Sequence, residues 1–443
     1  MTETRTGTKF DLSAAFDRPF FWTGGGSVRF LVARLSAQAA RAEGRAERAP
    51  LNIGLVIDAS GSMAGGKLEA AKQAALGLAE RLTERDRLTL VSFASEALIH
   101  LDAVPVTEDG MVEIRRQIGA LRPRDLTDLS GGWFAGVECT ARLAEEQPAL
   151  QPRIILLSDG HANRGIFDPD ALHAHARELR ARGVLTSALG IGDGYDEHLL
   201  RGIAENGGGR LHDAEHTEEI DKVLLGELAE MEGTAVENAV LSLVLPQGVE
   251  VHALGRASVT RHQGRLEVAL GPVPHGAARV VVFKVRCPSA QPGEVLAFEA
   301  SATGRAAGGA DLHAGPVSAT LTAADGNANA AQARDEELAA VVARAWSAEV
   351  VLTASRLNRD GAFAEVADYV DRELRFFRRY VQGLAAGPSL MRDLKLLGRR
   401  ASARLSPRMQ KEMMLQSLLV LEQRRDWRGP LKGHWRERLE QGE

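Results

Sequence analysis

The sequence predicts an α/β protein: a doubly wound, mostly parallel sheet that is inserted in, or followed by, an antiparallel β-sandwich, and then a C-terminal helical domain. Three observations lead to this prediction. In residues 50–235, short apolar runs alternate with segments whose apolar residues recur at helical spacing, which is typical of a parallel sheet covered on both faces. Residues 236–323 change to a two-residue period, which indicates antiparallel strands. Residues 330–443 return to helical spacing.

The composition is that of an ordinary folded protein. The 443 residues are 44% hydrophobic and 26% charged, so the chain can bury a core, unlike a disordered chain. Its two cysteines exclude a disulfide scaffold and a Cys-rich zinc module. A net charge of -5 argues against a dedicated nucleic-acid binder. The first residues lack the basic-then-apolar order of a secretory signal, so we expect the cytosol.

Residues 1–49 contain one expected strand and a connection. In SVRFLVARLSA, apolar and polar residues nearly alternate, which predicts a half-buried strand, and a polar segment rich in helix breakers follows it. This strand has no partner before residue 50. We therefore expect it to pair with the β region at 236–323, which would make the α/β domain an insertion; the alternative is that it lies at the edge of the α/β sheet.

Residues 50–235 form the expected α/β domain. Its segments, in order, are strand LNIGLVID, helix KLEAAKQAALGLAERL, strand DRLTLVSFAS, helices MVEIRRQIGAL and GGWFAGVECTARLAEEQ, strand RIILLSDG, helix DPDALHAHARELRARG, strand VLTSALGIG, helix DEHLLRGIAEN, strand GGRLHDA and helix TEEIDKVLLGELAEM.

Two further domains are expected after residue 235. Residues 236–323 contain segments such as RLEVALGPV and RVVVFKVRC, which predict the β-sandwich. Residues 330–443 are expected to be helical, and we expect Trp346, Phe376, Phe377 and Tyr380 to pack these helices together; docking of a partner by FFRRY is the alternative. From Pro388 onward there are 13 Lys and Arg against 7 Asp and Glu, which indicates a basic but solvated surface.

Two apolar strands end in aspartates, Asp58 and Asp159. Ligands of open α/β sheets bind at the carboxyl ends of the strands, so we expect both carboxylates to face one crevice. Ser60 and Ser62 follow Asp58 on a tight strand-to-helix turn, and Thr127 lies in a third loop. Carboxylate and hydroxyl oxygens are what Mg²⁺ prefers, with water completing its six ligands. The sequence therefore predicts a site for a hard divalent cation.

The same residues resemble a known family. DASGS at 58–62, the threonine in RDLTDLSGGW and LLSDG at 156–160 are similar to the metal-ion-dependent adhesion site of von Willebrand factor type A domains, in particular those of bacterial intracellular proteins. The family's pattern is Asp-x-Ser-x-Ser, then a threonine, then an aspartate, and all five positions are matched in order. The resemblance covers about residues 50–235.

The resemblance implies a role for each of the five residues. Ser60 and Ser62 would bind the metal directly, Thr127 directly or through water, and Asp58 and Asp159 largely through water. The cation would be Mg²⁺, with Mn²⁺ and Ca²⁺ as alternatives, and it would accept an acidic side chain from a partner protein. Residue 126 is leucine where relatives often carry glycine, so the turn before Thr127 is expected to differ.

We expect a non-enzymatic, metal-dependent interaction module that has no contact with a membrane. By the resemblance, its partners could include an AAA+ ATPase or a kinase/phosphatase system. One alternative is a Mg²⁺-dependent phosphohydrolase or phosphotransferase, with Asp58 as nucleophile and Asp159 as metal ligand. Another is nucleic-acid binding through the basic C-terminal helices. Residues 61–68 nearly spell a phosphate loop, but Leu68 stands where that motif requires a hydroxyl.

Overall fold

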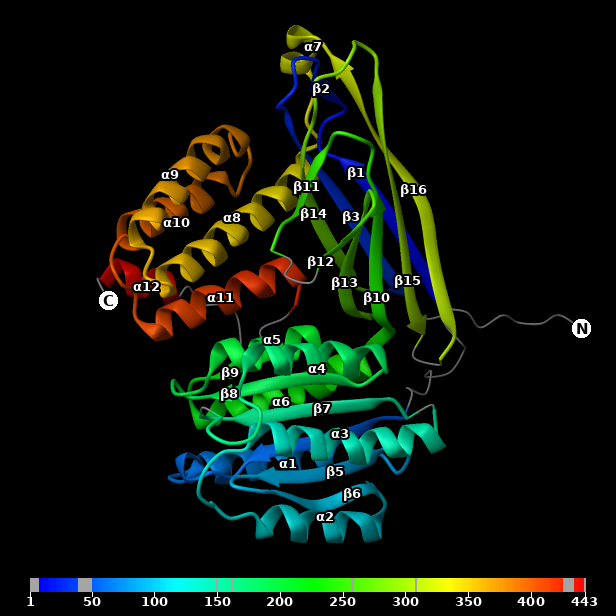
Figure 1. The fold of residues 1–443 in the computed structure, drawn as a ribbon, viewed down its shortest axis with the longest axis vertical. Coiled ribbons are helices and arrows are strands. Elements are labelled where there is room, and N and C mark those ends of the chain that lie inside the picture. The colour runs from blue at the N-terminus through cyan, green and yellow to red at the C-terminus, as the bar shows by residue number, and fades with distance from the viewer. Residues whose placement is uncertain are drawn as a thin grey trace, which may run out of the picture. The chain divides into compact units, whose positions relative to one another are not determined.

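The computed structural model describes residues 8–38, 50–148, 150–160, 162–255, 259–306, 309–424 and 434–441. The chain divides into two compact units (Figure 1). The first, called here the α/β unit, consists chiefly of Arg41–Asn238. The second, called the β/helical unit, combines Gly7–Ala40, Ala239–Gly304 and Asp311–Glu443.

The α/β unit contains a six-stranded sheet in the order β6-β5-β4-β7-β8-β9. Five strands are parallel, which confirms the predicted mostly parallel sheet, and β6 runs antiparallel to β5 at the edge. The strand β6 was not predicted from the sequence, because its side chains are largely exposed and show no strict alternation. The strands are β4 (Asn52–Asp58), β5 (Arg87–Phe93), β6 (Ala97–Pro105), β7 (Pro152–Ser158), β8 (Leu185–Ile191) and β9 (Gly208–Ala214).

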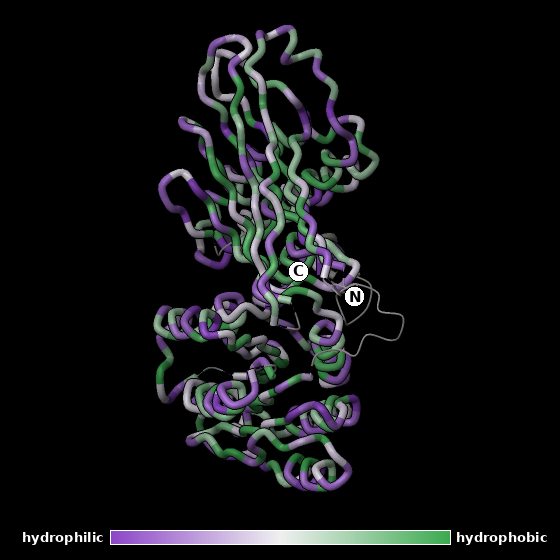
Figure 2. The backbone as a smooth tube through the Cα atoms, turned by 90° about the vertical axis from the view of Figure 1, so that its right-hand side faces the viewer, coloured by the Kyte–Doolittle hydropathy of each residue, from purple (hydrophilic) through white to green (hydrophobic). Residues whose placement is uncertain are grey.

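Helices cover both faces of this sheet. On one face, Ile53, Leu55 and Ile57 of β4 share a buried core with helices α1, α2 and α6. On the other, α3 packs on β4, β5 and β7, while α5 packs on β8 and β9. Figure 2 shows hydrophobic and hydrophilic stretches on the same helices, as expected for amphipathic helices. The helices are α1 (Lys67–Ala79), α2 (Glu108–Ala120), α3 (Leu129–Glu146), α4 (Pro169–Ala181), α5 (Glu197–Asn206) and α6 (Thr217–Glu232).

The β/helical unit contains two sheets, of order β1-β3-β14-β11 and β12-β13-β10-β15-β16-β2. The expected N-terminal strand is β3, which pairs antiparallel with β14 and with β1. The sequence pattern did not reveal β1 and β2. The strands are β1 (Lys9–Phe16), β2 (Phe20–Trp22), β3 (Val28–Gln38), β10 (Thr234–Val244), β11 (Glu250–Ala253), β12 (Val259–His262), β13 (Arg265–Pro274), β14 (Ala278–Arg286), β15 (Val295–Ala306) and β16 (Asp311–Ala324).

The helices of this unit pack through aromatic side chains. Trp346, Phe377 and Tyr380 are buried together, and the Trp346 ring contacts Phe30 of β3. Phe376, which we expected to pack with them, is 61% exposed, because it lies one residue out of the helical period. The helices are α7 (Gly326–Ala331), α8 (Glu336–Arg359), α9 (Phe363–Tyr380), α10 (Gly387–Arg400), α11 (Pro407–Glu422) and α12 (His434–Gln441).

Among the described residues, one helix, α8, has the length and the apolar composition that would allow it to cross a membrane. More than half of its apolar window (56%) is buried in the structure, as in the core helix of a folded domain.

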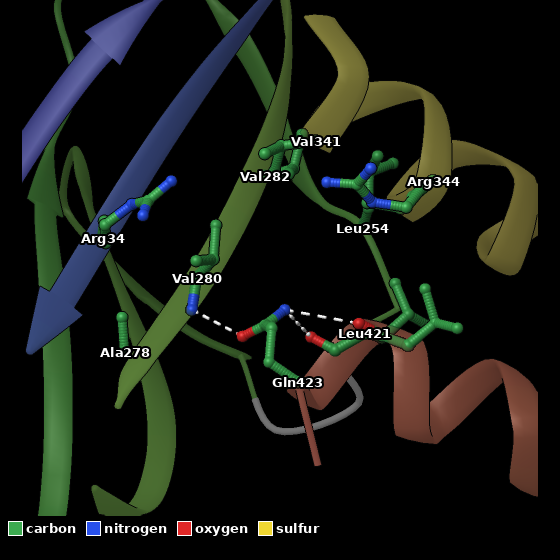
Figure 3. Close-up of a pocket in the computed structure, with 11 residues that line it drawn as sticks. Arg34, Leu254, Ala278, Val280, Val282, Val341, Arg344, Leu421 and Gln423 are labelled. Carbon is green, nitrogen blue, oxygen red and sulfur yellow. Dashed lines mark hydrogen bonds between the residues drawn. The ribbon is translucent and has the colours of Figure 1, made fainter. Parts of the chain in front are cut away.

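A pocket of about 270 Å³ lies among β3, β14, α8 and α11 of the same unit (Figure 3). Its walls are mostly apolar, with Arg34 and Arg344 on opposite sides. Gln423 holds the end of α11 against β14, because its Oε1 accepts from Val280 N at 2.6 Å and its Nε2 donates to Leu421 O at 2.7 Å. The Gln423 amide is therefore used in packing the unit.

Candidate metal centre

The candidate site lies at the carboxyl ends of β4 and β7, which are neighbours in the sheet. The register pairs Ile57 with Leu157, so Asp58 and Ser158 end their strands side by side. Asp159 follows Ser158 directly and is almost completely buried. The two aspartates therefore emerge from adjacent strand ends.

Asp58 is held by hydrogen bonds to both of its carboxylate oxygens. Oδ1 accepts from the backbone N of Ser60 at 2.8 Å, and Oδ2 accepts from Ser158 Oγ at 2.7 Å. Burial raises the pKa of Asp58, and the hydrogen bonds from the two serines act in the opposite direction. Asp58 thus fixes the turn that begins at Ser60.

That turn brings two hydroxyls to Asp159. After β4 the chain forms a short 3-10 turn, Gly61–Met63, before α1 begins. Ser60 Oγ and Ser62 Oγ lie 3.0 Å apart, and Ser62 Oγ donates to Asp159 Oδ1 at 2.6 Å. The structure therefore joins Asp58, Ser60, Ser62 and Asp159 in one hydrogen-bonded group.

Thr127 lies on the adjoining loop and is buried. Arg124 N donates to Ala59 O at 2.6 Å, which fastens this loop to the turn after β4. Thr127 N donates to Asn163 Oδ1 at 2.9 Å, and Thr127 O accepts from Asn163 N at 3.0 Å. Asn163 therefore fixes the backbone of Thr127, a role that its place in a loop sequence did not reveal.

Lys67 is a further residue of the site. Its Nζ lies 2.5 Å from Asp159 Oδ2, and its side chain is 34% exposed. Lys67 is the first residue of α1, within the stretch that resembles a phosphate loop. The sequence shows a lysine at this position, but its distance along the chain from other residues does not predict its contact with Asp159.

The turn before Thr127 has a backbone conformation that suits glycine. Leu126 has φ 61°, in the left-handed region, where a side chain costs about 1–2 kcal/mol. Leucine thus occupies a turn position that glycine would adopt without strain. The side chain of Leu126 is also exposed.

The oxygen donors fit a hard divalent cation. The predicted ligands are two carboxylates, which carry negative charge, and three neutral hydroxyls. Such oxygen ligands suit Mg²⁺, Mn²⁺ or Ca²⁺. Within the described residues, no group of three or more His, Cys, Asp or Glu side chains could hold a metal ion. A cation in the described part of the chain would therefore need ligands besides these four residue types, and the hydroxyl oxygens of Ser60, Ser62 and Thr127 are of a suitable kind.

A second polar cluster in the α/β unit lies in the interior. Glu227 of α6 accepts from Ser187 Oγ at 2.5 Å and contacts His212 Nε2 at 2.6 Å, with Arg210 3.7 Å away. Burial opposes the ionisation of Glu227, but His212, Arg210 and Ser187 together hold its pKa below the usual range. All four side chains are buried, so the cluster supports the fold and is not open to a substrate.

Comparison with known proteins identifies the type of the domain that carries these residues. Residues 52–224 match the family model of the von Willebrand factor type A domain. An uncharacterized Synechocystis protein, sll0103, is 30% identical over 268 residues, 58% of this chain and 62% of that protein. Human inter-alpha-trypsin inhibitor heavy chain H3 is 30% identical over 166 residues, 36% of this chain. The match spans only 18% of that heavy chain, so it concerns one domain.

Solved structures show the fold of a larger part of the chain. A von Willebrand factor type A protein from Catenulispora acidiphila has a TM-score of 0.71 at 17% identity, covering 94% of this chain and 98% of that one. The ArnB paralog VWA2 from Sulfolobus acidocaldarius has a TM-score of 0.55 at 14% identity, covering 92% and 98%. At such identities the likeness concerns the fold alone. Sequence and structure agree that residues 52–224 of this chain are a von Willebrand factor type A domain.

Proposed function

We propose that this protein is a non-enzymatic interaction module that binds an acidic side chain of a partner protein through Mg²⁺ at its metal-ion-dependent adhesion site. The observation that carries the proposal is the hydrogen-bonded group of Asp58, Ser60, Ser62 and Asp159 at two adjacent strand ends. The family supports it, since its domains are generally metal-dependent interaction modules.

The five side chains would have two different roles at the cation, set by their positions. Ser60, Ser62 and Thr127 would offer hydroxyl oxygens to the cation, and Asp58 and Asp159 would orient these groups and bind the waters around it. When bound, the cation supplies an electrophilic coordination position for a carboxylate oxygen. Because the hydroxyls are neutral, they leave the positive charge of the cation largely available to that foreign carboxylate.

Two features weigh against the phosphohydrolase alternative. Asp58 is fully buried, and both of its oxygens accept hydrogen bonds. A nucleophile needs an oxygen that can approach the substrate in line. In addition, Ser60 stands two residues after Asp58, where an acid would be needed to protonate the leaving group.

The nucleic-acid alternative is also weakly supported. Several arginines of the basic C-terminal helices pair with carboxylates of the same unit. Arg436 contacts Asp393 at 2.7 Å, and Arg408 and Arg438 contact Glu412 at 3.2 and 3.4 Å. Such pairing reduces the free positive charge that a phosphate backbone requires.

The cytosol remains the proposed compartment, and its reducing conditions suit the two free, buried cysteines. An AAA+ ATPase or a kinase/phosphatase system remains a proposed partner. An affinity pull-down, read by mass spectrometry, tests the proposal. Proteins retained in Mg²⁺, released by chelator and missing with the Asp58→Ala/Ser60→Ala variant would support it. Retention that ignores both chelator and variant would contradict it.

A further inference from the structure

The pocket of about 270 Å³ in the β/helical unit has an apolar floor (Figure 3). Strand β14 provides two valines, helix α8 an alanine, helix α11 a leucine, and the segment after β11 a second leucine. All five side chains are buried: Val280, Val282, Ala345, Leu421 and Leu254. They belong to one compact unit, so the pocket is a feature of that unit alone.

The polar groups of the floor are already paired within the fold. Val280 N donates to Gln423 Oε1 at 2.6 Å, and Leu254 N donates to Val282 O at 2.9 Å. Gln423 Nε2 donates to Leu421 O at 2.7 Å. Water in the pocket would therefore find few partners on the floor, whereas well-ordered buried water makes about two to four hydrogen bonds. Replacing such water by an apolar group favours binding.

Two arginines lie at the opening of the pocket. Arg34 of β3 and Arg344 of α8 are both exposed, and Figure 3 shows their guanidinium groups pointing toward the space between them. Arg34 pairs with Glu337 at 3.8 Å, near the limit of an ion pair, and the Glu337 side chain is 84% exposed. For the guanidinium of Arg344, the described part of the chain provides no ion-pair or hydrogen-bond partner.

The charges around the opening suit a single negative charge. No acidic side chain is among the described residues that line the pocket. Arg34, Arg344 and Glu337 together carry one net positive charge, which a monoanion would neutralise. A carboxylate matches this charge, and its two oxygens accept parallel hydrogen bonds from a planar guanidinium.

The volume limits the size of the ligand. Small-molecule sites commonly have volumes of about 300–1,000 Å³, so this pocket is at the small end. At about 30 Å³ for each water-sized group, it has room for roughly nine or ten non-hydrogen atoms. A short apolar chain or ring that ends in a carboxylate has this size, whereas a folded partner does not enter such a pocket.

We propose that this pocket is a ligand site for a small monocarboxylic acid with an apolar body. The carboxylate lies between Arg34 and Arg344, and the apolar body packs on Val280, Val282 and Leu421. The site shares no residue with the candidate metal centre, so it does not depend on the proposed function. It gives the β/helical unit a binding activity of its own.

Isothermal titration calorimetry of the full chain with three probes tests the proposal. Octanoate has the required charge and size, 1-octanol has the same chain without the charge, and butanoate has the same charge on a shorter chain. The variant Arg34→Gln/Arg344→Gln removes the two positive charges. The matched control, Arg356→Gln/Arg375→Gln, removes two exposed arginines of α8 and α9 that lie outside this pocket.

Octanoate should bind the full chain at one saturable site, at least tenfold more tightly than butanoate, because more of its chain lies on the apolar floor. The Arg34/Arg344 variant should bind octanoate about tenfold more weakly and 1-octanol as the full chain does, because only the carboxylate needs the charges. A second variant, Ala278→Leu, enlarges a side chain that lines the pocket and should weaken both probes. Chelator should change none of these results, which separates this site from the metal centre.

No saturable octanoate binding by the full chain would overturn the inference, as would equal octanoate affinity in the full chain and the Arg34/Arg344 variant. Equal weakening by the Arg356/Arg375 control would also overturn it, because general surface charge would then be responsible. A peptide that ends in leucine with a free carboxylate serves as a further probe. If it bound this pocket more tightly than octanoate, the occupant would be the end of a protein chain and the assignment to a small acid would be wrong.

Discussion

Lys67 and Asp159 form a close ion pair at the mouth of the candidate metal centre, with Nζ 2.5 Å from Oδ2. The other oxygen of Asp159 accepts from Ser62 at 2.6 Å. One carboxylate therefore serves both a serine proposed to bind the cation and a positive charge supplied by the chain itself. A divalent cation bound at this centre would compete with the Lys67 ammonium for the negative charge of Asp159.

Replacing Lys67 by methionine should tighten Mg²⁺ binding, because it removes a like charge while keeping most of the aliphatic chain. The expected change is about two- to tenfold, since one partly exposed charge alters the binding free energy by about 0.4–1.4 kcal/mol. Isothermal titration calorimetry measures it, with Lys222→Met on the exposed surface of α6 as the control. Equal or weaker Mg²⁺ binding by the Lys67 variant would show that the lysine does not compete.

The pH dependence of stability should contain a contribution from Glu227. Although burial opposes its ionisation, His212, Arg210 and Ser187 lower its folded-state pKa below the ordinary value of 4.5. A lowered carboxyl pKa stabilises the fold above the unfolded-state value, and this stability is lost as the pH falls through the folded-state value. Urea unfolding of the full chain between pH 6 and pH 3, followed by circular dichroism, measures the loss.

The variant Glu227→Gln should show a shallower dependence on pH. It should also be less stable at pH 7, by about 1–3 kcal/mol, because glutamine has no charge and leaves part of the buried hydrogen-bonding groups of Ser187, His212 and Arg210 unsatisfied, whereas Arg210 keeps its ion pair with Glu230 at 3.3 Å. An acid profile identical to that of the unaltered chain would mean that Glu227 is not the group responsible.

Both thiols should be unreactive in the folded protein. Burial raises the pKa of Cys139 and of Cys287 to about 11, so little thiolate exists at pH 8, and neither sulfur is accessible. A colorimetric thiol reagent should therefore label neither cysteine over minutes at pH 8, and should label both in urea. Rapid labelling of one equivalent without urea would contradict the burial of that residue.

Removing residues 1–38 should unfold the β/helical unit and spare the α/β unit. Strand β3 pairs along β14, and its Phe30 and Val32 also enter the core of the C-terminal helices. Without β3, both the sheet and the helical core lose a central element. Two-dimensional NMR should then show dispersed signals from residues 50–238 only. Well-dispersed signals from strands such as β14 in the shortened chain would argue that β3 is dispensable.

The α/β sheet and the placement of the aspartates could be predicted because buried parallel strands leave a clear pattern. Each such strand is a short, continuous apolar run, and the polar residues at its end mark the carboxyl end of the strand. Asp58 and Asp159 satisfy this rule, and the structure places them at neighbouring strand ends. The metal-binding role of the five residues stays a prediction.

Other features could not be predicted, because they depend on tertiary contacts. Strand β6 is an exposed edge without alternation. The direction of the Lys67 side chain depends on a carboxylate 92 positions away in sequence, and the place of Asn163 depends on Thr127, 36 positions away. The spacing of residues within a short segment contains no information on which distant loops come into contact. The aromatic run predicts that Phe376 packs with its neighbours, but only one side of α9 is buried, and Phe376 lies on the exposed side.

The central claim is that the oxygens of three loops hold one divalent cation, and Mg²⁺ calorimetry on the full chain and the Asp58→Ala/Ser60→Ala variant tests it most directly. The full chain should bind one Mg²⁺ saturably, and the variant should give no binding heat while its circular dichroism spectrum matches that of the full chain. Equal Mg²⁺ affinity in the two proteins, or no binding by the full chain, would contradict the claim.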